Sequence, residues 1–74
     1  MNSLTKIHKV YFRLDCGGLI GFGHLSRCMS LGEELLKENI EPVFIIRKRP
    51  SIAHLRIPFK TIWLEEIPDT TVMN

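Results

Sequence analysis

The chain has few cysteines and no long apolar run, and each of these absences excludes a class of protein. Its two cysteines, Cys16 and Cys28, are too few for a disulfide framework, and free thiols are typical of a reducing compartment. No stretch approaches the roughly 18 apolar residues that a membrane span needs, and the first residues lack the apolar segment of a secretory signal. We therefore predict a cytoplasmic protein with no membrane partner.

The chain also has little excess charge. Its net charge of +2, from ten Lys and Arg against eight Asp and Glu, is too small to indicate a nucleic-acid partner. Its basic cluster, Arg47-Lys48-Arg49, is not interleaved with aromatic side chains, and we expect it to be a solvated strand end or loop. The 45% apolar and 24% charged contents are those of an ordinary globular chain, and 74 residues allow one small domain.

Residues 9–37 organise the chain, because they predict a strand, a glycine-rich loop and a helix. Residues 9–14 carry the β-branched and aromatic side chains that strands favour, and residues 15–23 then include four glycines. From 24–37 the apolar residues recur at the spacing of one helical face, and we expect the helix to end near Asn39. A strand that leads into such a loop and a helix N-terminus is a common anion site.

The remaining chain predicts two more strands and a short helix. Residues 43–46 form a continuous apolar run, which is typical of a parallel strand covered on both faces. Ser51 suits the N-cap of a two-turn helix over 51–57, which Pro58 would end. Residues 59–64 are the third predicted strand.

The predicted fold class is α/β, a partial Rossmann-like parallel sheet of about three strands and two helices. Doubly wound domains usually need about twice this length, so we expect residues 1–74 to be the incomplete N-terminal part of a larger domain. Such a chain is either a fragment or a truncated product. Residues 1–7 are expected to form a frayed leader, and residues 65–74 show no usable period.

His24 is the candidate catalytic residue, because it stands at the predicted helix start directly after Gly21-Phe22-Gly23. The positive end of the helix dipole favours a neutral imidazole, which acts as a general base near neutral pH. Asp15 stands at the end of the first strand. If it lies close to His24, its carboxylate would favour the charged imidazole instead and would orient the ring. The alternative is an ordinary surface or capping histidine.

Three charged side chains are candidate substrate-binding residues. Arg27 lies one helical turn after His24, where its guanidinium would reach a phosphate or carboxylate, or would pair with Asp15. Arg13 and Asp15 end the first strand, and ligands of open α/β sheets bind beyond the carboxyl ends of the strands. The alternative for Arg13 and Asp15 is an internal ion pair that fixes the loop.

Two familiar kinds of site do not fit the sequence. The spacing of Gly21 and Gly23 departs from the G-x-G-x-x-G fingerprint, and the Gly-Lys-Ser/Thr ending of a phosphate loop is absent. We therefore expect neither a nicotinamide cofactor nor P-loop ATP binding. Cys16, His24 and Cys28 are potential metal ligands, but Cys28 belongs to the apolar helix face, so we expect no metal site.

Two neighbouring motifs together resemble one family. They are Phe12-Arg13-x-Asp15 and Ile20-Gly21-x-Gly23-His24-x-x-Arg27-Cys28-x-x-Leu31. They are similar to the N-terminus of the UDP-2,4-diacetamido-2,4,6-trideoxy-β-L-altropyranose hydrolases of pseudaminic acid biosynthesis, and to that of related spore-coat polysaccharide biosynthesis proteins. The similarity is dense over residues 10–36 and looser through residues 43–47. The loop Cys16-Gly17-Gly18-Leu19 departs from the small polar residues usual in the family.

The resemblance implies a GT-B-like enzyme, in which two Rossmann-like domains face a cleft. Such enzymes transfer the sugar of a UDP-sugar to water, without a metal and with inversion at the anomeric carbon. The histidine that matches His24 would activate or position the attacking water. The substrate-binding residues that the resemblance implies are Arg13, Asp15, Gly21, Gly23 and Arg27.

The family is expected to hold most of the UDP through a C-terminal domain, so we predict that residues 1–74 alone have little or no activity. Two other interpretations stay open. One is the N-terminal domain of a GT-B glycosyltransferase, with a sugar or lipid acceptor. The other is a non-catalytic chain, either a decayed fragment or a small interaction module. The sequence predicts no oligomeric state.

Overall fold

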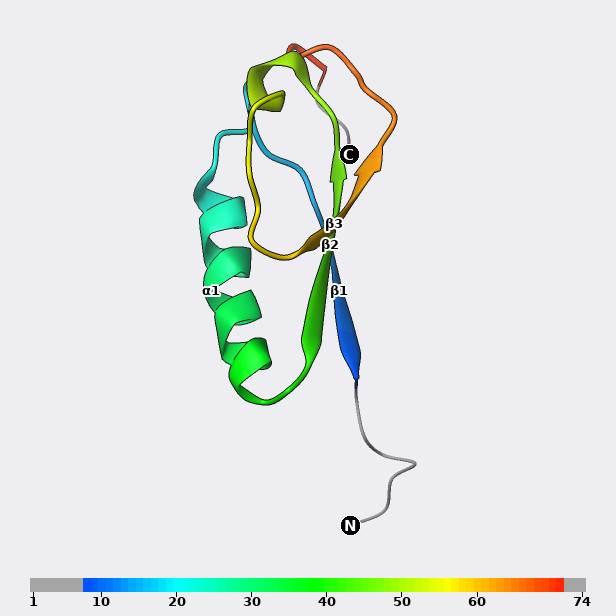
Figure 1. Cartoon of the computed structure of the whole chain (residues 1–74). Helices are drawn as coiled ribbons and strands as arrows, with labels where there is room; N and C mark the ends of the chain where they lie inside the picture. Colours follow the sequence, from blue (N-terminus) through cyan, green and yellow to red (C-terminus); the bar gives the residue numbers. More distant parts are fainter. Residues whose placement is uncertain (1–7, 72–74) are drawn as a thin grey trace.

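The computed structural model describes residues 8–71 and shows an α/β fold with a three-stranded parallel sheet. Its elements are β1 (Lys9–Leu14), α1 (Gly23–Lys37), β2 (Glu41–Arg47), the 3₁₀ helix η2 (Pro50–Ile52) and β3 (Lys60–Leu64). The strands lie in the order β1-β2-β3 and run in one direction, so their carboxyl ends meet at the upper edge in Figure 1. The predicted fold class is confirmed.

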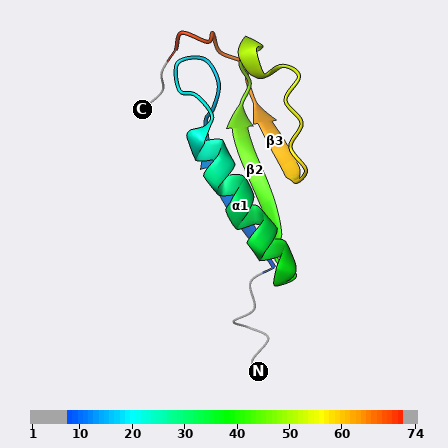
Figure 2. The ribbon, with the colours of Figure 1, turned by 90° about the vertical axis from the view of Figure 1, so that its left-hand side faces the viewer.

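Helix α1 covers one face of the sheet, and the core lies between them (Figures 1 and 2). The buried core side chains are Leu14, Cys16, Leu25, Cys28, Phe44, Ile46 and Ile52. Phe44 lies at the centre, with its ring centroid 5.0 Å from that of Phe12 and 5.3 Å from that of Phe59. Because strand side chains alternate between faces, the neighbours of these core residues point to the other side of the sheet.

That other face carries no helix within residues 8–71. Tyr11 and Ile62 are accordingly about half exposed there, although Val43 between their strands is buried. Parallel sheets are normally covered on both faces, so this side of the fold is the less protected one.

Helix α1 ends as the sequence predicts. Asn39 has a φ of 60°, and its amide donates to the carbonyl of Leu36 at 3.0 Å. The amide of Ile40 donates to the carbonyl of Leu35 at 2.9 Å, which completes a Schellman motif. The chain then reverses into β2.

The predicted two-turn helix over 51–57 is wrong, because the segment forms only the 3₁₀ turn Pro50–Ile52. The amide of Ile52 donates to the carbonyl of Arg49, three residues back, and not four as in an α-helix. A segment this short, with a proline at each end, adds too few α-helical bonds to offset the cost of helix nucleation. Ser51 does not cap a helix; its amide donates to the Asp69 carboxylate.

The three predicted strands are present, and β1 has the predicted bounds. The predicted leader, residues 1–7, and the end of the predicted tail, residues 72–74, lie outside the described residues. Between residues 8 and 71, no helix has both the length and the apolar character that crossing a bilayer requires.

Candidate functional site

The glycine-rich segment between β1 and α1 forms a closed loop at the carboxyl edge of the sheet. The amide of Gly17 donates to the carbonyl of Gly21 at 3.0 Å, and the amide of Ile20 donates to the carbonyl of Gly17 at the same distance. Gly21 has a φ of 79°, a conformation that other residues rarely adopt. The loop therefore depends on glycine at this position of the family-like motif.

His24 is the second residue of α1, and its side chain is exposed. The N-cap residue, Phe22, forms no side-chain cap, and the first turn of α1 contains no acidic residue. Within residues 8–71, His24 takes part in no ion pair. The imidazole is therefore accessible to solvent and to a ligand at the carboxyl edge of the sheet, next to the loop.

Arg27 is also exposed, one turn further along α1. A Cβ placed on Gly23 would lie 3.7 Å from a terminal nitrogen of the Arg27 guanidinium. The guanidinium therefore folds back over the helix start, toward the turn that carries His24. An exposed base and an exposed cation are thus close to the same helix end, and this pairing suits a ligand with an anionic group.

Arg13 and Asp15 form the ion pair that was the alternative prediction for them. Their closest nitrogen and oxygen atoms are 2.9 Å apart, and the same guanidinium nitrogen donates to the carbonyl of Leu14 at 2.6 Å. Arg13 alternates with Leu14, so its side chain leaves the sheet on the face that α1 does not cover. The Asp15 carboxylate is therefore held by Arg13 at the end of β1, and no ion pair joins it to Arg27 within residues 8–71.

Arg49 is the residue that the sequence interpretation placed wrongly. It was expected to be solvated with Arg47 and Lys48, but only 1% of its surface is exposed. Arg49 follows β2 in extended conformation, which directs its side chain toward the segment that follows β3. One guanidinium nitrogen donates to the carbonyls of Pro68 and Asp69, at 3.1 and 3.2 Å.

A hydrogen-bonded group next to Arg49 connects the glycine loop to the rest of the edge. The Ser51 hydroxyl donates to the Asp69 carboxylate at 2.6 Å and accepts from the amide of Gly18 at 2.9 Å. A Cβ on Gly18 would clash with the carbonyl of Asp69, so the two segments meet in backbone contact. This group fixes the loop that precedes His24, and no sequence motif indicated it.

The comparisons with known proteins identify no relative of this chain. No protein-family model, no curated protein and no solved structure matches the chain. The functional interpretation therefore depends on the motif and on the geometry described above.

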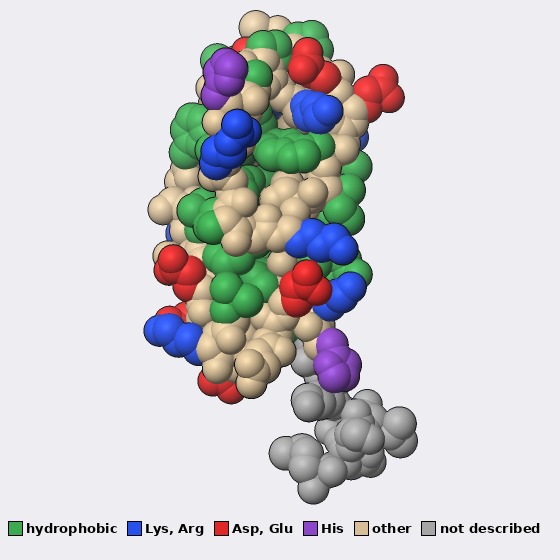
Figure 3. Space-filling view, in the orientation of Figure 1, with side chains coloured by type: hydrophobic (Ala, Val, Ile, Leu, Met, Phe, Trp, Pro, Cys, Tyr) green, Lys and Arg blue, Asp and Glu red, His purple; other side chains and the backbone are tan. Residues whose placement is uncertain are grey.

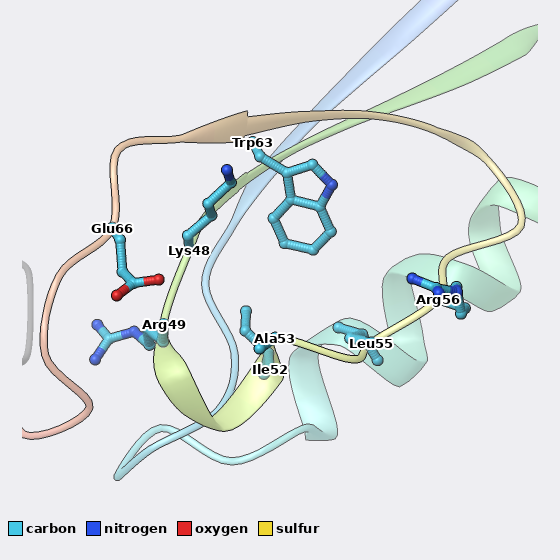
Figure 4. A pocket seen from close by; sticks show the side chains of 8 residues that line it. All are labelled: Lys48, Arg49, Ile52, Ala53, Leu55, Arg56, Trp63 and Glu66. Atoms are coloured by element: carbon cyan, nitrogen blue, oxygen red, sulfur yellow. The ribbon is translucent and has the colours of Figure 1, made fainter.

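A pocket of about 290 Å³ opens beside Arg49, between the ends of β2 and β3 and the connection that follows η2 (Figure 4). Its lining residues are Lys48, Arg49, Ile52, Ala53, Leu55, Arg56, Trp63 and Glu66. None of the predicted site residues lines it. Trp63 packs against the core, and its indole also forms a wall of this pocket.

Both cysteines belong to the core and not to a site. Burial raises the pKa of the Cys16 thiol above its ordinary value of 9.0; Asp15 adds to the rise and Arg49 opposes it. Burial also raises the pKa of the Cys28 thiol, with Arg27 opposing the rise. Protonated thiols are poor nucleophiles and metal ligands. In the part of the chain that the structure describes, no three His, Cys, Asp or Glu side chains are grouped to hold a metal ion.

Proposed function

We propose that the chain is the N-terminal part of a GT-B-like nucleotide-sugar hydrolase. Its reaction would release UDP from UDP-2,4-diacetamido-2,4,6-trideoxy-β-L-altropyranose, in the pathway to pseudaminic acid. The observation that supports this most is the position of His24, exposed in the first turn of α1 directly after the glycine loop. Ligands of open α/β sheets bind at this edge.

In the proposed reaction His24 acts as the general base. Its neutral imidazole takes a proton from water while the water oxygen attacks the anomeric carbon. The bond between that carbon and the diphosphate oxygen breaks, and the electron pair leaves with UDP. The water approaches opposite the leaving group, which inverts the anomeric centre. No metal takes part.

The other residues of the motif have supporting roles in this proposal. Arg27, which folds back toward Gly23, would contact an anionic or carbonyl group of the substrate. Gly21 permits the turn of the loop, and the ion pair of Arg13 with Asp15 holds the end of β1 beneath it. A second nucleotide-binding domain would hold the UDP, and the cytoplasm is the proposed compartment.

The first experiment measures UDP release by residues 1–74 alone and by a form that carries a downstream nucleotide-binding domain. We expect release only from the longer form, with free sugar as the second product. His24→Ala should lower kcat by about 10²- to 10⁴-fold, the usual contribution of a general base, while UDP affinity is unchanged.

His8→Ala is the matched control, because His8 is also exposed but precedes β1, at the opposite edge of the sheet. Its activity should equal that of the unaltered protein. Full activity of His24→Ala would contradict the proposal. A glycosylated acceptor in place of free sugar would indicate a glycosyltransferase.

A further inference from the structure

The pocket beside Arg49 has the composition of a binding site for an anion. Three of its lining residues are cations, Lys48, Arg49 and Arg56, and one is an anion, Glu66. The Arg49 guanidinium points away from Trp63, toward the segment after β3 (Figure 4), so Lys48 and Arg56 are the cations that a ligand in the pocket would meet directly. Charges of one sign gathered in a concave surface raise the local concentration of ions of the other sign. Figure 3 shows basic and apolar side chains side by side in the upper part of the molecule.

Arg49 adds a buried charge that forms no ion pair within residues 8–71. Its Nε and one terminal nitrogen are buried and have no hydrogen-bond partner among these residues. Its partners are two backbone carbonyls. A buried cation without a counter-charge is unfavourable, and an anion bound nearby would offset that cost.

Trp63 supplies the apolar wall. In Figure 4 its indole extends from β3 into the space between the lining residues, with Lys48 on one side and Arg56 on the other. An indole face between cations suits a flat ring that carries a negative group, since stacking holds the ring and the cations hold the charge. The volume of about 290 Å³ is close to the lower end of small-ligand pockets, so the ligand is small.

We propose that this pocket binds a small organic phosphate with a planar ring, of the nucleoside monophosphate class. The phosphate would contact Lys48 or Arg56, within the positive field of Arg49, and the ring would lie against Trp63. The site does not include His24 or its loop. The proposal is therefore independent of the proposed hydrolase function, and either can fail without the other.

The chain provides its own probe, because Trp63 is its single tryptophan. The 74-residue protein is titrated with UMP, AMP, uridine and inorganic phosphate while tryptophan fluorescence is recorded. The nucleotides are expected to change the emission with saturation, and to bind at least about tenfold more tightly than uridine or phosphate, because only they combine the ring with the charge. Added salt should weaken binding.

Lys48→Gln and Arg56→Gln each remove one exposed charge from the pocket, and at least one should weaken nucleotide binding about tenfold, the effect of losing one charged hydrogen bond. Glu66→Gln should strengthen it. Lys60→Gln is the matched control, because it removes an exposed charge of the same strand as Trp63 but outside the pocket. Circular dichroism checks that each variant is folded.

Three results would overturn the proposal. They are an absence of any fluorescence change at millimolar nucleotide in the folded protein, equal binding of nucleotide and phosphate, and unchanged affinity in both Lys48→Gln and Arg56→Gln. If the longer form shows no UDP-sugar hydrolysis while nucleotide still binds to this pocket, the result counts against the hydrolase proposal alone.

Discussion

Two regions at the carboxyl edge of the sheet are built in opposite ways. The loop before α1 exposes most of its side chains, with Leu19 at 75% and Phe22 at 49%, and closes through bonds within its own backbone. The region after β2 and β3 also has backbone hydrogen bonds, but it is held in addition by side chains, with buried Arg49 and the Ser51–Asp69 hydrogen bonds at its centre. The comparison indicates that the second region fixes the first, through Gly18, and leaves His24 accessible.

The largest effect is expected when Arg49 is removed from the fixed region. Arg49→Ala should lower the free energy of unfolding by about 3 kcal/mol, because it leaves a cavity and unpaired carbonyls. Arg49→Met fills most of the volume and removes two nitrogen atoms that have no hydrogen-bond partner, so it should cost only about 1 kcal/mol. Urea unfolding followed by circular dichroism measures both losses. Equal losses would contradict this account, because they would mean that the volume of the side chain makes no difference.

The connection between the two regions is tested by a pair of glycines. Gly18→Ala should cost about 2–3 kcal/mol, since the residue has a φ of 55° and a Cβ there would strike the Asp69 backbone. Gly21→Ala has a similar φ, 79°, but no atom within 4 Å of the added Cβ, so it should cost only about 1–2 kcal/mol. A larger loss at Gly21 than at Gly18 would contradict the contact described.

A smaller effect is expected from Ser51→Ala, which removes hydrogen bonds to Asp69 and to Gly18. It should lower the free energy of unfolding by about 1–2 kcal/mol and speed amide hydrogen exchange in the glycine loop. Ser30→Ala is the control, because that exposed hydroxyl only donates within α1. Similar exchange in the two variants would contradict the account, because it would mean that the hydrogen bonds of Ser51 do not fix the glycine loop.

The smallest effect concerns the buried thiols. The pKa values of both thiols are raised in the folded chain. Their contribution to the free energy of unfolding is therefore fully present below the ordinary pKa of 9.0 and is lost as the pH rises above it. The free energy of unfolding should therefore fall as the pH rises above about 9, and it should fall less in a Cys16→Ala/Cys28→Ala variant. An unchanged pH slope in that variant would contradict the assignment.

The sequence predicts the regular elements better than the connections between them. The β-branched and aromatic residues of β1, the helical period over α1 and the apolar run in β2 each reflect the local environment of their element, and these patterns are local. Asn39 indicates the helix end because its left-handed conformation is itself a local property. The short helix failed as a prediction because the segment between Pro50 and Pro58 is too short to offset the cost of helix nucleation, and Ser51 bonds to Asp69, which is 18 residues away.

The same distinction between local and distant contacts applies to the candidate site. The glycine loop and His24 are contiguous in sequence, so spacing alone brings them together. Arg49 is buried by a segment 19 and 20 residues later, and the pocket beside it combines side chains from both sides of β3. Neither arrangement has a periodicity or a motif, and a basic triplet after a strand is indistinguishable in sequence from a solvated loop.

Hydrolysis in ¹⁸O-labelled water tests the central claim most directly, that His24 delivers water to the anomeric carbon. With a form that carries the proposed nucleotide-binding domain, this account predicts that the label enters the released sugar and not the UDP, and that His24→Ala stops its incorporation. Label in the terminal phosphate of UDP would mean attack at phosphorus. That result, or undiminished incorporation in His24→Ala, would contradict the account.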